Sequence, residues 1–189
     1  MKHSLRKLSI IASGALLACS FATFAQAEFS LTSKDINAGE LMPKAQEFTG
    51  FGCTGSNISP ELSWSDIPSG TKSFAVTAYD PDAPTGSGWW HWVLINIPAD
   101  VNQLVTGAGN PDKNLLPKGS QMFDNDYGSK SFGGACPPEG DKAHRYQFKV
   151  FALGVDKLEL PEDASAALVG YYLYSNAIST ATLEALYKR

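Results

Sequence analysis

Runs of lysine or arginine are missing from this sequence, and acidic residues outnumber basic ones, 19 to 15. A chain with this balance repels the phosphate backbone of a nucleic acid at long range, so no nucleic-acid partner is expected. Internal repeats and low-complexity segments are missing as well. The pattern therefore points to an ordinary globular domain rather than to a nucleic-acid-binding tail or array.

Long apolar runs are also rare, and only one approaches the ~20 residues that a membrane span needs. It covers about 8–24, follows a basic start, and is interrupted by three serines and a glycine. It ends in Ala25-Gln26-Ala27, the small-x-small pattern that a signal peptidase accepts. We predict a signal peptide over 1–27, cleaved after Ala27, and a single domain over 28–189 that is periplasmic or secreted. An uncleaved anchor and a lipoprotein modified at Cys19 are the alternatives.

The predicted export changes the charge and the cysteine count. Losing the leader removes three basic residues and no acidic one, which leaves twelve basic against 19 acidic residues and a formal charge of −7. One of the three cysteines is lost, and Cys53 and Cys136 remain. An even number of cysteines in an oxidising compartment indicates a disulfide, with a reactive thiol as the alternative.

Helical periodicity is scarce, and only one helix is expected, over about 164–176 with Asp163 as its N-cap. The stretch 181–187 suits a helix or a strand, and its threonines favour a strand. The residues at helical spacing that suggest the helix are Leu168, Tyr171, Tyr172 and Ser175.

Glycine and proline clusters divide the rest into short segments rich in strand-forming residues. The segment 90–97 is nearly all apolar, which is typical of a central strand covered on both faces. Alternation along it predicts Trp90 and Trp92 on one face, and Trp89 with His91 on the other. Many short strands and few helices predict a mainly β fold, an antiparallel β-sandwich or Greek-key sheet pair. The predicted strands are 29–33, 62–65, 73–79, 90–97 and 146–153.

Two histidines remain after export, and each lies where a loop meets an apolar strand. His91 follows the loop that contains Asp80 and Asp82, and His144 follows the proline-rich loop at 133–142. Each could be a structural histidine, and each aspartate a turn residue. A carboxylate beside two imidazoles would instead hold them cationic or fix their tautomers. Their shared placement favours a site that binds phosphate or a similar oxyanion.

The glycine-rich and proline-rich loop would complete such a site. Backbone N–H groups of Gly133 and Gly134 are expected to donate to the anion, and Pro137 and Pro138 to stiffen the loop. Trp89 either packs in the core or lines the site, where its ring would contact a cationic head group such as ethanolamine.

These motifs, in their order and spacing, resemble those of phosphatidylethanolamine-binding proteins, and within them the bacterial, Raf-kinase-inhibitor-like branch with its exported members. The resemblance spans nearly all of the mature chain. It is carried by Ser59–Trp64, Asp80-Pro81-Asp82-Ala83-Pro84, Trp89-Trp90-His91-Trp92 with Asn96, Asn125–Gly128, Cys136-Pro137-Pro138 and His144-Arg145-Tyr146.

The resemblance implies a β-sandwich of one large and one small antiparallel sheet with a few short peripheral helices. Family members bind phosphate-like or phospholipid head groups, and some inhibit kinases or proteases. This implies a binding or inhibitor-like protein rather than an enzyme, and it implies no cofactor. A protein partner is possible in this family. The oligomeric state stays open, and a homodimer is one of the alternatives. The implied pocket consists of Asp80, His91, Gly134, Pro138, His144 and Tyr146, with Asp82 and Trp89 nearby.

Two departures and several rival chemistries complete the sequence evidence. Cys136 stands where eukaryotic relatives have glycine, and the aromatic residue near their C-terminus has no clear equivalent here, which puts phospholipid specificity in doubt.

A metal- or thiol-dependent hydrolase using His91 and His144 is the alternative function. A serine hydrolase lacks its G-x-S-x-G motif. The glycines at 50–55 match a dinucleotide pattern, but no helix can follow them.

Overall fold

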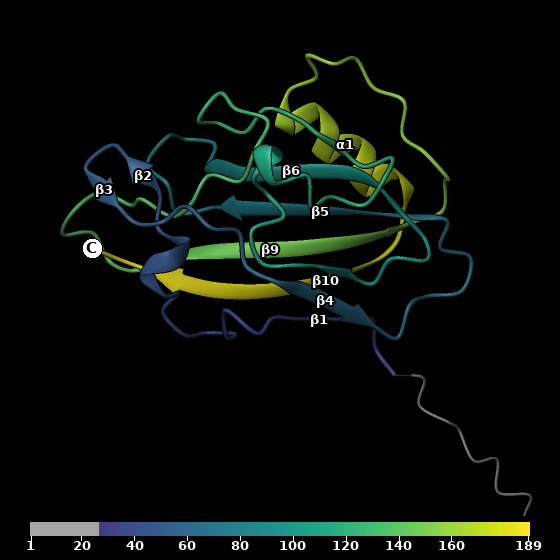
Figure 1. Cartoon of the computed structure of the whole chain (residues 1–189), viewed down its shortest axis with the longest axis horizontal. Helices are drawn as coiled ribbons and strands as arrows, with labels where there is room; N and C mark the ends of the chain where they lie inside the picture. Colours follow the sequence, from purple (N-terminus) through teal and green to yellow (C-terminus); the bar gives the residue numbers. More distant parts are fainter. Residues whose placement is uncertain (1–26) are drawn as a thin grey trace, which may run out of the picture.

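The computed structural model describes residues 27–189, so the predicted leader lies outside the described residues and stays a prediction. Within that range the chain is mainly β, with one α-helix and several antiparallel sheets (Figure 1). No helix in this part of the chain is long and apolar enough to span a bilayer. The large sheet has the order β10-β9-β5-β6-β8, formed by Ala177–Tyr187, His144–Leu153, Ser73–Asp80, Trp89–Pro98 and Gln121–Met122.

Smaller elements surround this sheet. A three-stranded sheet has the order β1-β4-β7 (Ser30–Thr32, Leu62–Ser65 and Gln103–Leu104), and β2 (Thr49–Gly50) pairs with β3 (Cys53–Thr54). The helix α1 spans Ala166–Asn176, and two 3-10 helices span Lys44–Gln46 and Pro111–Lys113. The sequence-based strands are confirmed within a few residues, and so is the strand at the end of the chain.

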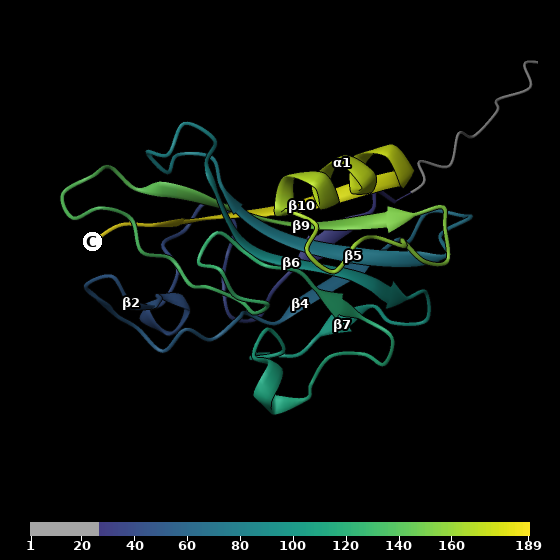
Figure 2. The same ribbon diagram turned by 90° about the horizontal axis from the view of Figure 1, so that it is seen from above.

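The large sheet is buried on both faces, which explains why β6 is almost continuously apolar. One apolar cluster contains Trp64 of the small sheet together with Val76 and Trp92 of the large one. A second contains Val93 and the α1 residues Val169 and Leu173. Figure 2 accordingly shows α1 on one side of the large sheet and β4 and β7 on the other. The mainly β, antiparallel prediction is confirmed, and the finer description as a Greek-key sandwich stays a prediction.

A β-bulge in β6 overturns the predicted alternation of its tryptophans. Ala78 pairs with Trp92 and Tyr79 pairs with Trp90, so His91 has no residue opposite it. A bulge adds one residue to one strand and shifts the side chains beyond it to the other face. Trp90 consequently packs with the helix-side cluster, whereas Trp92 lies in the cluster on the opposite face. The prediction that the two share a face was wrong.

The helix also begins and faces differently from the prediction. Its N-cap is Ser165, whose side chain accepts a hydrogen bond from Leu168 N at 3.2 Å, and not Asp163. The buried side of α1 is formed by Ala166, Val169, Gly170 and Leu173. The larger residues chosen from the sequence lie on the outer side, and Tyr171 is 67% exposed. Residue size misled the prediction, because small residues let α1 approach the sheet closely.

Gly134 lies where two segments of chain come too close for a side chain. A Cβ atom there would be 2.3 Å from Gln46 O and 2.6 Å from Phe48 N, both of them backbone atoms that cannot move independently. We therefore expect Gly134→Ala to lower the free energy of unfolding by roughly 1–3 kcal/mol or more, as overpacking does.

Gly154→Ala is the matched control, since its Cβ would meet Ile178 at an ordinary 3.6 Å. Urea denaturation followed by tryptophan fluorescence measures both variants. Equal stability of the two would contradict the close approach at Gly134.

Candidate functional site

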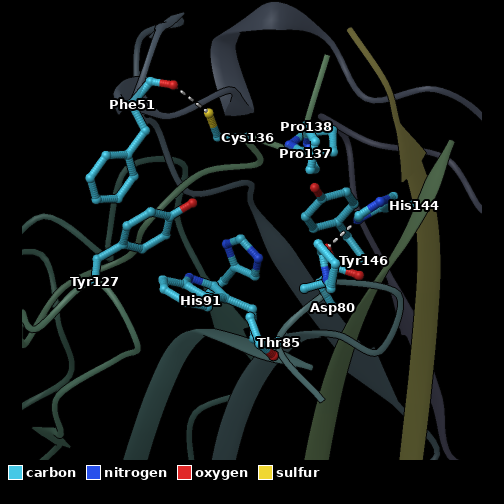
Figure 3. Close-up of a pocket in the computed structure, with 13 residues that line it drawn as sticks. Phe51, Asp80, Thr85, His91, Tyr127, Cys136, Pro137, Pro138, His144 and Tyr146 are labelled. Carbon is cyan, nitrogen blue, oxygen red and sulfur yellow. Dashed lines mark hydrogen bonds and ion pairs between the residues drawn. The ribbon is translucent and has the colours of Figure 1, made fainter. Parts of the chain in front are cut away.

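A cavity of about 170 Å³ opens at the edge of the large sheet where β5 ends and β6 and β9 begin (Figure 3). Antiparallel neighbours bring the end of one strand beside the start of the next, which gathers these loop-flanked residues. Six of the eight predicted ligand-binding residues line it: Asp80, Trp89, His91, Pro138, His144 and Tyr146.

His91 is held in one tautomer by the chain that faces it. Its Nδ1 lies 2.8 Å from Gly133 O and 3.1 Å from Gly134 O. Carbonyl oxygens only accept hydrogen bonds, so Nδ1 carries a hydrogen and donates to them. Burial lowers the pKa of His91, although these carbonyls and the charge of Asp80 oppose that shift. An uncharged ring in this tautomer has its lone pair on Nε2.

His144 is paired with a buried carboxylate. Its Nδ1 lies 2.8 Å from Asp80 Oδ2, and both side chains are only 3% exposed. Since a carboxylate accepts, His144 Nδ1 donates, and Nε2 lies 3.5 Å from Oδ2 of the half-exposed Asp141. The other oxygen of Asp80 accepts a hydrogen bond from Asp82 N at 2.8 Å. Asp80 thus fixes both the orientation of His144 and the turn that follows β5.

Two buried donors on lining residues make no hydrogen bond of normal geometry among residues 27–189. These are Trp89 Nε1 and the Tyr146 hydroxyl. Burial raises the pKa of Tyr146, and the negative charge of Asp80 and a weak contact of the hydroxyl with that carboxylate reinforce the shift, so the hydroxyl keeps its hydrogen. An unpaired buried donor costs free energy, typically about 1–3 kcal/mol, so each one calls for an explanation such as a bound ion or water. Trp64 Nε1 is a third donor of this kind, on a residue that does not line the cavity.

Asp82 and Gly134 have other contacts. Asp82 binds Arg145 through both carboxylate oxygens, at 2.8 and 2.9 Å, and this ion pair holds the pKa of Asp82 down to about 2. Gly134 N donates to Asn57 Oδ1 at 2.6 Å, and Gly133 N donates to His91 O at 2.8 Å. The prediction that these two N–H groups serve an anion was therefore wrong. The loop offers His91 its carbonyls instead.

An aromatic wall was missed by the sequence analysis. Tyr127 and Phe51 line the cavity, and Tyr127 stacks on Phe48 with the ring centroids 4.0 Å apart. The Tyr127 hydroxyl donates to Gly134 O at 3.0 Å. Asn125 holds this loop, because its Nδ2 donates to His91 O while its Oδ1 accepts from Tyr127 N. The only sequence signal was the turn-like run 125–128.

The predicted disulfide between Cys53 and Cys136 is present. It joins β3 to the loop that carries Pro137 and Pro138, so the hairpin with Phe51 at its turn is tied to the cavity wall. The thiol-dependent hydrolase alternative is wrong, because both sulfur atoms are bonded to each other. Among residues 27–189 no three His, Cys, Asp or Glu side chains are grouped to hold a metal ion.

Replacing both cysteines by serine should lower the free energy of unfolding by about 4–5 kcal/mol, the chain-entropy value for a loop that spans 83 residues. Guanidinium denaturation of the oxidised protein and of the Cys53→Ser/Cys136→Ser variant gives the difference. Thiol titration of the folded wild type is the control. Two titratable thiols would contradict the disulfide.

Comparison with known proteins agrees with this geometry. The family model described as Phosphatidylethanolamine-binding protein matches residues 32–188. UPF0098 protein YbcL of Escherichia coli strain K12 is 54% identical over 170 residues, which cover 89% of this chain and 93% of YbcL. UPF0098 protein YbhB of the same organism is 45% identical over 157 residues, covering 83% and 98%.

The solved structures show the same relationship. The crystal structure of E. coli YbcL, described as a new member of the mammalian PEBP family, matches with a TM-score of 0.84 at 55% identity. The match covers 86% of this chain and 99% of that one. The chain belongs to the phosphatidylethanolamine-binding protein family.

Proposed function

We propose that this protein is an exported binding protein whose pocket takes a small anion of the phosphate type. The observation that carries the proposal is a cavity lined by two histidines together with Trp89 and Tyr146, whose buried donors, Trp89 Nε1 and the Tyr146 hydroxyl, make no hydrogen bond of normal geometry in the described residues. A small shift of either side chain would bring its donor to the cavity surface, where an oxyanion would satisfy it with a charge-assisted hydrogen bond, about twice as strong as a neutral one.

The size and walls of the cavity support a head group rather than a whole lipid. Its volume of about 170 Å³ is below the ~300–1,000 Å³ of sites for drug-sized ligands. The last aromatic residue, Tyr187, does not line the cavity and donates its hydroxyl to the buried Glu47. Phospholipid binding would therefore rest on the head group, with the remainder of the molecule outside.

The disulfide supports export, because disulfides persist in oxidising compartments such as the periplasm. A signal peptide cleaved after Ala27 would deliver the chain there, and lipidation at Cys19 is the alternative route. Both features lie at or before the start of the described residues, and they are proposed from the sequence.

A second candidate function is modulation or inhibition of a partner protein. Phe51 favours it, since this large apolar side chain is 72% exposed at the rim of the pocket. An anionic side chain of the partner would then enter the cavity while Phe51 contacts the surface around it. A solvent-exposed aromatic residue beside a pocket is typical of binding surfaces.

Tyr146→Phe tests the anion site with opposite effects on binding and stability. Loss of a hydrogen bond to a charged group should weaken inorganic phosphate roughly ten- to hundredfold by titration calorimetry. The melting temperature without ligand should stay equal or rise, because an unpaired buried hydroxyl is removed.

Tyr174→Phe is the matched control, since its hydroxyl contacts Lys149 Nζ at 2.8 Å outside this cavity. It should bind phosphate as the wild type does. If Tyr146→Phe and Tyr174→Phe have the same phosphate affinity, the Tyr146 hydroxyl is not a ligand-binding group.

A further inference from the structure

His91 offers the cavity a ring nitrogen whose partner nitrogen is already engaged. Within residues 27–189 its ring makes hydrogen bonds only through Nδ1, to the two glycine carbonyls. The ring lies between Tyr127 and Tyr146 in Figure 3, at 5.6 and 5.1 Å between centroids. Nε2 is therefore the nitrogen left for a guest, and in the uncharged ring it holds a lone pair.

The charged and titratable groups that face His91 come from three parts of the chain. Asp80 ends β5, Asp126 and Tyr127 belong to the loop after β8, and His144 and Tyr146 begin β9. The two carboxylates favour a charged imidazole, but burial outweighs them and lowers the pKa of His91. Asp126 is also engaged, because its Oδ2 accepts from Trp90 N at 2.7 Å.

We propose that His91 Nε2 accepts a hydrogen bond from the bound anion, so that the pocket selects oxyanions that carry a proton of their own. Hydrogen phosphate and singly protonated phosphate monoesters have an O–H for Nε2 and bare oxygens for Trp89 Nε1 and the Tyr146 hydroxyl. Sulfate has no O–H and would place an oxygen lone pair against the lone pair of Nε2. The proposal rests on the anion-binding function above and narrows its ligand class.

The discrimination follows from the cost of an unpaired group. A site built to bond a ligand hydroxyl rejects an analogue without it, because the buried partner is left unsatisfied. Around neutral pH, inorganic phosphate carries at least one proton and sulfate carries none, although their size and shape are alike. We expect phosphate to bind at least roughly tenfold more tightly than sulfate.

Protonation of His91 is the way in which sulfate could still bind. Nε2–H would then donate to the anion, and the proton would be taken from solvent. Sulfate affinity should therefore fall about tenfold for each pH unit above the pKa of His91, whereas phosphate affinity should change much less, because phosphate supplies the shared proton itself.

Titration calorimetry of the wild-type protein with sodium phosphate and sodium sulfate at about pH 8 and about pH 6 tests this. The proposal is supported if phosphate binds more tightly than sulfate at the higher pH and the ratio of the two affinities is smaller at the lower pH. Equal affinities at the higher pH would overturn it while leaving the anion-binding function intact. If neither anion binds at either pH, the proposed function itself fails, and this inference with it.

Two further measurements test the role of His91 directly. His91→Gln places an amide near the position of Nε2, which can turn either its oxygen or its NH₂ to the ligand. The preference for phosphate over sulfate should then shrink toward one, with phosphate binding retained. Nitrogen-15 chemical shifts of His91 in the unbound wild type should show Nδ1 protonated and Nε2 bare; the opposite tautomer would overturn the proposal even if the variant did not fold.

Discussion

The close approach of residues 133–136 to residues 46–48 on one side and to the start of β6 on the other is the constraint on which the pocket depends. It leaves no room for a side chain at Gly134, and it turns two carbonyls toward His91 Nδ1. The same segment ends at Cys136, whose disulfide ties in the hairpin that carries Phe51. The path of this segment thus sets the tautomer of a buried imidazole and the position of two cavity walls. A side chain at Gly134 would disturb all of these together.

Much of the fold could be predicted because its strands are dense in β-branched and aromatic residues and are separated by glycine and proline. The segment 90–97 was recognisable as central because burial on both faces leaves no polar alternation. The bulge at His91 left no such signal, since an added residue in an apolar strand changes register without changing composition. The buried face of α1 was missed for a related reason: close packing selected Gly170 and Ala166, while tyrosines remained outside.

The residues of the candidate site were also predictable from the sequence only in part. Asp80, His91 and His144 were predictable because ionisable residues at strand ends stand out in an acidic chain with few histidines. The Asp80–His144 contact of 2.8 Å follows from neighbouring strands in the sheet. The roles of the glycines were not predictable, because whether Gly133 and Gly134 present N–H groups or carbonyls depends on how the loop turns. Tyr127 was missed since only tertiary contacts bring it to the cavity.

An anion pocket in a chain of this charge must rely on short-range interactions. The predicted mature form carries a formal charge of −7, and the buried carboxylate of Asp80 lies in the pocket itself. At long range an anion is repelled, and added salt screens that repulsion over about 10 Å. For the proposed anion the balance would reverse inside the cavity, because hydrogen bonds strengthen where water is excluded and the dielectric is low. Asp80 already accepts hydrogen bonds from His144 and from Asp82 N, which would offset part of its repulsion of the proposed anion. Directional hydrogen bonding, and not net positive charge, is therefore what such a pocket can use to choose among anions.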